Sequence, residues 1–132
     1  MCAHFKNHIK LGPSCAMALP CDGDRILILK HNWLSLVVDG SKTMEIRGSK
    51  LKAGKCFFGW KSNIYASAIL GEPIEIPDIQ QWGNLRMQHR VLGNVLPYKK
   101  TYGLPIRNVE RLEPPLSFCH PKGAIGIVKY KV

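Results

Sequence analysis

Three side chains that could carry chemistry lie close together in the chain, at Lys42, Glu45 and Arg47. An ammonium, a carboxylate and a guanidinium in one place can bind a planar polar ligand, and they can also carry out acid–base chemistry. In an extended strand Glu45 and Arg47 point to one face about 7 Å apart, whereas Met44 and Ile46 point to the other face. The pattern therefore predicts a charged strand face backed by an apolar one.

The residues before these side chains must bring them to the start of the strand. Asp39 and Gly40 form a helix-stop and turn signal, so Lys42 is expected where the turn meets the strand. Thr43 is expected on the same face as Glu45. The spacing is also typical of a solvated strand face with surface ion pairs, which are common and weak. The residues alone do not decide between a binding cleft, an acid–base site and a plain surface.

The segment Gly40–Arg47 reads G-x-K-x-x-E-x-R, which resembles the signature of the ASCH domain family, a branch of the PUA-like β-barrels. The resemblance covers about residues 25 to 131. Before the motif it includes the strand-like run from Ile26 and the tryptophan Trp33. After the motif it includes Tyr98–Val109 and Pro114–Val128, which are similar to the phage and bacterial members. It implies an α+β fold: a small mixed β-barrel with about five or six strands and two or three flanking helices.

The resemblance implies two kinds of function. ASCH domains as a group are associated with RNA or nucleoside binding, some members resemble enzymes that hydrolyse the acetyl amide of an acetylated cytidine nucleoside, and others are linked to RNA cleavage. The amidohydrolase-like members have a threonine three positions after the lysine, where this chain has Glu45, and Thr43 does not take that place. We expect an RNA- or modified-nucleoside-binding module, with a hydrolase in which Lys42 and Glu45 are catalytic as the alternative.

The charge of the chain favours a polyanionic partner. Lysine and arginine number 19 against 9 acidic residues, which gives a formal charge of +10 in 132 residues. Two aromatic–basic groups outside the motif suit stacking on bases and pairing with phosphates, although a barrel-rim tryptophan and a polar loop look the same in sequence. These groups are Trp60 with Lys61, and Tyr98, Lys99, Lys100 and Tyr102.

Other functional classes lack support in the sequence. It has no Gly-rich phosphate loop, no Ser-His-Asp order and no H-E-x-x-H. No apolar run is long enough to span a bilayer. The five cysteines are odd in number and include no C-x-x-C, which argues against disulfides and for a reducing compartment, cytoplasmic or nuclear. We expect no cofactor, no membrane partner and a monomer.

The chain divides into an extension, residues 1–24, and one domain, residues 25–132. Cys2, His4, His8, Cys15 and Cys21 have a spacing that fits no zinc pattern, so the extension is expected to be loosely ordered and free of metal. In the domain, we expect strands at 25–30, 42–47, 56–60, 64–70, 74–76, 104–112 and 124–131, helices at 33–38, with Asn32 as its N-cap, and 80–92, and a loop at Pro114–Pro115.

Overall fold

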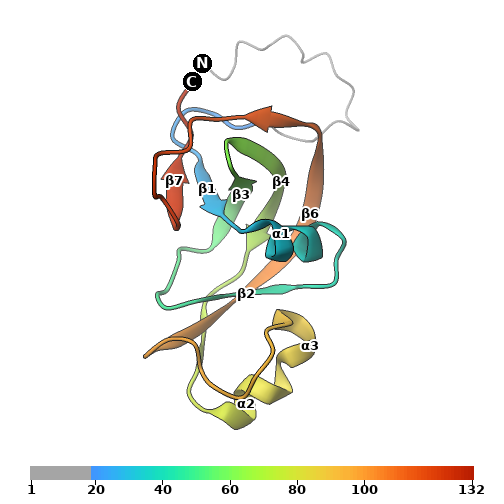
Figure 1. Ribbon diagram of the computed structural model, residues 1–132, viewed down its shortest axis with the longest axis vertical. Helices are drawn as coiled ribbons and strands as arrows, with labels where there is room; N and C mark the ends of the chain where they lie inside the picture. The colour runs from blue at the N-terminus through green and yellow to red at the C-terminus, as the bar shows by residue number, and fades with distance from the viewer. Residues whose placement is uncertain (1–18) are drawn as a thin grey trace.

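Seven strands and three helices make up the part of the chain that the computed structural model describes, residues 19–132. The strands form one strongly curled sheet, a half-barrel (Figure 1). The strands are β1 (Arg25–Ile28), β2 (Met44–Arg47), β3 (Gly54–Trp60), β4 (Asn63–Leu70), β5 (Ile74–Ile76), β6 (Thr101–Ser117) and β7 (Ile127–Lys129). The helices are α1 (His31–Val38), α2 (Ile79–Asn84) and α3 (Arg86–His89).

The sheet is mixed, and its order is β2-β6-β4-β3-β1-β7, with β5 also paired to β6. β1 and β3 are parallel, and the other pairs are antiparallel. The first part of the long strand β6 pairs with β2 and β5, and its later part pairs with β4. This arrangement confirms the expected α+β class. The described residues contain seven strands, as many as the sequence pattern predicts and more than the five or six that the resemblance implies.

The central strands are buried on both faces. Leu27 and Phe58 belong to a core that includes buried residues of α1, whereas Ile26 and Phe57 belong to a second core. The strand expected at 56–60 is present as part of β3, and its residues from Cys56 to Gly59 are buried. A third cluster, which includes Trp82 of α2 and apolar residues of β2 and β5, lies away from these two. In Figure 1, α2 and α3 lie at the opposite end of the molecule from β7.

Helix α1 differs from the expectation at its start and agrees at its end. Its N-cap is Lys30, because the Lys30 carbonyl accepts the first hydrogen bonds of the helix from the Trp33 and Leu34 N–H groups. The Lys30 side chain makes no capping hydrogen bond. The expected N-cap Asn32 is therefore wrong, since it lies inside the helix. At the other end, Gly40 has φ +88°, a conformation that glycine adopts without strain. This turn directs the chain into β2.

The helix expected at 80–92 is two short helices. The helix is interrupted at Leu85, and α3 ends at His89, with Arg90 as its C-cap at φ 64°. His89 is completely buried and Arg90 lies beyond the end of α3, so these two residues and Arg86 do not form an exposed basic helix face. The stacking of His89 on Trp82, with ring centroids 3.9 Å apart, is a tertiary contact that helical spacing does not predict.

The expected loop at Pro114–Pro115 is also wrong, because β6 continues to Ser117. Both prolines lie where the pairing of β6 with β4 is irregular. Leu116 pairs with Ile64, but the next pair joins Arg111 to Ala66. Proline has no N–H to donate to a ladder, so it is tolerated at such an interruption.

The beginning of the described chain is joined to its end. Gly23 donates to the Tyr130 carbonyl at 2.7 Å, and Tyr130 donates to the Asp24 carbonyl at 2.8 Å.

Cys21 is disulfide-bonded, so the expectation of no disulfide is wrong; an odd number of cysteines excludes complete pairing but not a single pair. Cys56 and Cys119 are free.

The expectation for Cys2, His4, His8 and Cys15 lies outside the described residues. Within residues 19–132, no cluster of three or more potential ligands could hold a metal ion. No helix in this range is long and apolar enough to cross a membrane.

Candidate functional site

A cleft of about 410 Å³ opens where β2, the start of α1 and the segment before β6 meet. Lys42, Glu45 and Arg47 all line it, so the strand alternation correctly predicts that Glu45 and Arg47 share a face. The alternate residues Met44 and Ile46 are buried in the cluster around Trp82. The volume lies within the range of ligand pockets, about 300 to 1,000 Å³.

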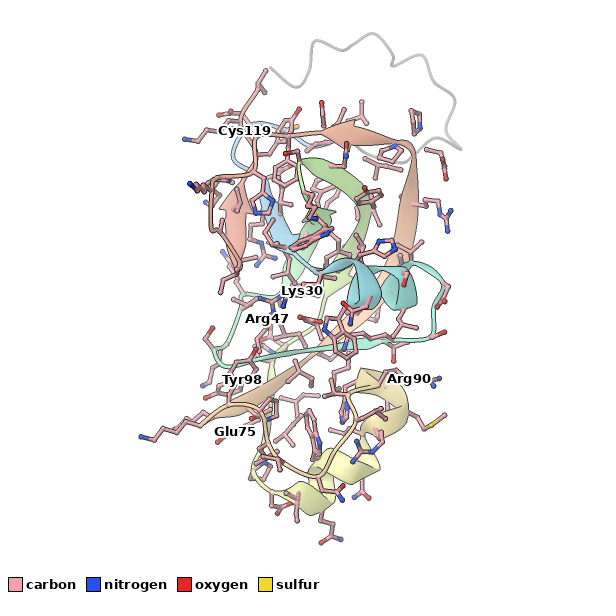
Figure 2. The ribbon with its side chains drawn as sticks, in the orientation of Figure 1. Lys30, Arg47, Glu75, Arg90, Tyr98 and Cys119 are labelled. Atoms are coloured by element: carbon pink, nitrogen blue, oxygen red, sulfur yellow. The ribbon has the colours of Figure 1, made fainter. Side chains whose placement is uncertain are left out.

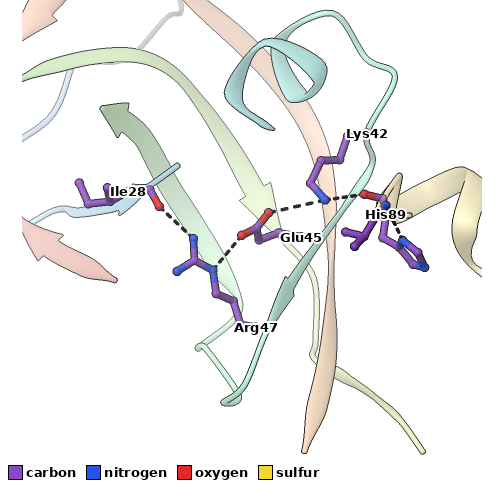
Figure 3. A network of polar contacts seen from close by, with 6 residues as sticks. Ile28, Lys42, Glu45, Arg47 and His89 are labelled. Carbon is purple, nitrogen blue, oxygen red and sulfur yellow. Dashed lines mark hydrogen bonds and ion pairs between the residues drawn. The ribbon is translucent and has the colours of Figure 1, made fainter. Parts of the chain in front are cut away.

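Glu45 lies between the two cations. Its Oε2 accepts a hydrogen bond from Arg47 Nε at 2.8 Å, and its Oε1 lies 3.7 Å from Lys42 Nζ (Figure 3). The Glu45 side chain is only 7% exposed, so little water screens these pairs. The carboxylate is thus held in one orientation, with one oxygen directed to each cation.

Lys42 is buried almost completely, with its side chain 1% exposed. Its Nζ donates a hydrogen bond of 2.6 Å to the His89 carbonyl and lies 4.8 Å from the centroid of the Trp33 ring. Burial lowers the pKa of Lys42; Glu45 opposes this shift, and the Arg47 charge adds to it. Lys42 therefore gives up its proton more easily than an exposed lysine.

Arg47 ties three parts of the chain together. Besides its bond to Glu45, it donates from Nη2 to the Ile28 carbonyl at 2.9 Å and from Nη1 to the Ile125 carbonyl at 3.1 Å. These carbonyls belong to the end of β1 and to the segment before β7. The guanidinium is therefore fixed at the wall of the cleft, with 18% of the side chain exposed.

Three aromatic residues complete the walls, Trp33, Trp60 and Tyr98. Tyr98 packs directly against Gly48, because a Cβ added at Gly48 would lie 2.8 Å from Tyr98 Cδ1. The Thr101 hydroxyl, which donates to the Tyr98 carbonyl at 3.1 Å, holds the turn that carries this ring. Tyr98 is 45% exposed, so part of its surface is open to a ligand.

The remaining sequence-predicted residues do not line the cleft. Thr43 is exposed and precedes β2, so the strand alternation does not reach it. Lys61 lies in the turn between β3 and β4, with its Nζ 5.7 Å from the Trp60 ring centroid. Lys99 and Lys100 are exposed beside Tyr98. Tyr102 is buried in β6, with Lys50 Nζ 5.9 Å from its ring centroid. Their ligand-binding roles stay predictions.

Sequence reasoning missed other parts of the site. Trp33 was expected only within the helix at 33–38, and His89 only within the helix at 80–92. The Ile28, His89 and Ile125 carbonyls, which hold the two cations, have no sequence signal, because every residue has a carbonyl.

The fold is similar to crystal structures of an ASCH protein from Zymomonas mobilis. One structure of that protein matches with a TM-score of 0.65 at 14% identity, covering 83% of this chain and 88% of that chain. A Ser-to-Ala mutant also matches at 0.65, with 13% identity and coverage of 86% and 92%. No family model and no curated protein matches the sequence. The chain therefore has the ASCH-domain fold, which is α+β.

Proposed function

We propose that the chain binds RNA or a nucleoside and holds one base in the cleft. One observation carries this proposal: a buried carboxylate, Glu45, is held between Lys42 and Arg47 in a cleft walled by aromatic rings. The ASCH-domain fold is consistent with it. The binding of a base here is our inference from the chemistry of these groups.

Each group of the cleft suits a different part of a base. A carboxylate only accepts hydrogen bonds, so Glu45 suits an amino group on the base edge. The Lys42 ammonium has three protons, one of which bonds to the His89 carbonyl, and another can reach a base carbonyl oxygen. Trp60 and Tyr98 offer faces on which a base can stack. An unstacked base of a single strand can present both its face and its edge.

The surroundings of the cleft suit the rest of a nucleic acid. Lys30 lines the cleft and is exposed, and Lys99 and Lys100 follow the wall residue Tyr98. Lysines around an aromatic cleft can contact phosphates while the base is inside. The contribution of phosphate contacts to affinity is independent of the base sequence and depends on salt, whereas the contact with Glu45 provides base selectivity.

Hydrolysis of an acetylated cytidine nucleoside or of RNA is the second candidate, and the lowered pKa of Lys42 favours it. A neutral amine can still donate one proton to the His89 carbonyl, and its lone pair is then free to act as a base or nucleophile. Glu45 could then position a water molecule or transfer a proton. Arg47 would hold a carbonyl or phosphate oxygen.

Titration with free nucleosides and short single-stranded RNA tests the proposal, with tryptophan fluorescence as the signal because Trp33 and Trp60 line the cleft. Glu45→Gln should lose the preference for bases with an amino group. The control, Glu75→Gln, removes the same charge from an exposed position on β5 (Figure 2) and should behave like the unaltered protein.

Chromatography of the same mixtures detects hydrolysis. Product formation that disappears in Glu45→Gln would favour the second candidate. Equal base preference in both variants, with no product, would show that the cleft does not read a base.

A further inference from the structure

His89 is a polar residue that is completely buried, yet it does not line the cleft. Its ring stacks on Trp82, with centroids 3.9 Å apart and planes 19° apart. Burial of a polar ring is favourable only when its nitrogens are hydrogen-bonded. The partners of the two nitrogens therefore show what this residue contributes.

Those partners determine the protonation state of the ring. The Val91 backbone N–H donates to His89 Nδ1 at 2.9 Å, so Nδ1 carries no proton. His89 Nε2 lies 2.9 Å from the Trp82 carbonyl, which only accepts, so Nε2 carries the proton. The ring is neutral, in a single tautomer, with both nitrogens in use.

The same turn holds Lys42. The Val91 bond to the ring closes the backbone around Arg90, which has φ 64°. The carbonyl within this turn, that of His89, accepts the 2.6 Å hydrogen bond from Lys42 Nζ, as Figure 3 shows. The preceding carbonyl, that of Gln88, accepts from the Thr43 N–H at 2.9 Å. The ring thus closes the turn whose carbonyls bond to Lys42 and Thr43, the two residues directly before β2.

We propose that His89 is a positioning residue for the cleft: its neutral ring fixes the turn that holds the Lys42 ammonium, and protonation of the ring opens the turn and frees Lys42. A proton on Nδ1 would face the Val91 N–H, and two donors cannot bond to each other. Val91 itself lines the cleft, so the change would also move part of the wall. The consequence for ligand binding rests on the proposed function, whereas the coupling of His89 to Lys42 does not.

The environment of the ring opposes protonation until the solution is acidic. Burial lowers the pKa of His89 below its ordinary value of 6.5; the bond to the Trp82 carbonyl acts in the opposite direction, and the cations Lys42 and Arg86 lower the pKa further. As the pH falls, the unfolded chain therefore takes up this proton before the folded chain does. The stabilisation by neutral His89 is complete above the ordinary pKa and is lost as the pH falls towards the lowered one.

Nuclear magnetic resonance of the full chain, labelled at histidine and lysine, tests the coupling without any substitution. At neutral pH we expect His89 with a bare Nδ1 and a protonated Nε2. On acidification, the Lys42 side-chain signals should change with the same midpoint as His89, and not with that of exposed His31 or of His120. Lys42 signals that stay constant while His89 titrates would overturn the proposal, and so would a proton on Nδ1 at neutral pH. Simultaneous loss of all amide signals would also overturn it, because release should be confined to the cleft.

Two variants provide a second test. His89→Asn keeps an acceptor for the Val91 N–H but cannot titrate, so its Lys42 signals should show no change at the midpoint measured for unaltered His89. His31→Asn, on the exposed first residue of α1, should keep the original response. The same response in His89→Asn as in the unaltered protein would contradict the proposal. Failure of nucleosides and RNA to bind at any pH, with the coupling intact, would refute only the proposed function.

Discussion

The side-chain ammonium of Lys42 and the backbone carbonyl of His89 lie 2.6 Å apart, although 47 positions separate them in the chain. This bond joins the entrance of β2 to the end of α3. The same ammonium lies beside Glu45 in the cleft. Lys42 therefore contributes both to the fold and to the candidate site. The effect of its substitution on stability must be measured separately from the effect on ligand binding.

Lys42→Ala should destabilise the protein strongly. It leaves the buried His89 carbonyl without its donor and Glu45 without one of its cations, and breaking such a buried pair costs about 3 to 5 kcal/mol. Urea denaturation measures the change in the free energy of unfolding. The control, Arg111→Ala, breaks a pair whose side chains are 57% and 66% exposed, and should cost no more than about 1 kcal/mol. Equal effects of the two substitutions would show that the Lys42 bonds contribute little.

The double substitution of Lys99 and Lys100 by alanine should weaken RNA binding and reduce its dependence on salt. The plot of log affinity against log salt has a negative slope, and each phosphate contact that is lost makes this slope less steep by about one unit. Affinity measured at several salt concentrations gives this slope. The matched control replaces Lys129 and Lys131, which are exposed but do not line the cleft. A larger loss in the control pair would place the phosphate contacts near β7 instead.

Gly48→Ala should change the cleft by displacing Tyr98, because the new Cβ would lie 2.8 Å from Tyr98 Cδ1. We expect a lower affinity for nucleosides and RNA with the fold retained, as measured by titration and circular dichroism. The control, Gly83→Ala, places a Cβ in open space on α2 and should instead stabilise the helix by about 0.5 to 1 kcal/mol. Unchanged affinity in Gly48→Ala would indicate that Tyr98 is not part of the binding surface.

The two free cysteines within residues 19–132, Cys56 and Cys119, should differ in their reaction with a thiol reagent. Cys119 is exposed, whereas burial raises the pKa of Cys56 to about 11, so Cys56 lacks both access and thiolate at neutral pH. Of these two cysteines, mass spectrometry of the folded protein should find the label on Cys119, and unfolding should add the label on Cys56. Rapid labelling of Cys56 in the folded state would contradict its burial.

Because the folded protein keeps the Cys56 proton to a higher pH than the unfolded chain does, Cys56 lowers stability as the pH rises from its ordinary pKa of 9.0 towards 11.

Much of the local structure around the site was predictable because it depends on neighbours in the sequence. Alternation in an extended strand placed Glu45 and Arg47 on one face and Met44 and Ile46 in the core. The Asp39-Gly40 turn ended α1 where the sequence indicated, since φ +88° at position 40 suits glycine. The apolar run at 56–60 was correctly expected to be a strand, which is part of β3.

Contacts between distant segments decided the rest. The acceptors of Lys42 and Arg47 are backbone carbonyls 47, 19 and 78 positions away, and only the folded chain brings them together. The stacking of His89 on Trp82 accompanies the split of the helix expected at 80–92, and irregular pairing with β4 allowed prolines inside β6. The sequence by itself determined which charged side chains share a strand face, because that depends on backbone geometry over a few residues. Only the tertiary structure decided what holds them and what walls the cleft, because those groups come from separate elements of the curled sheet.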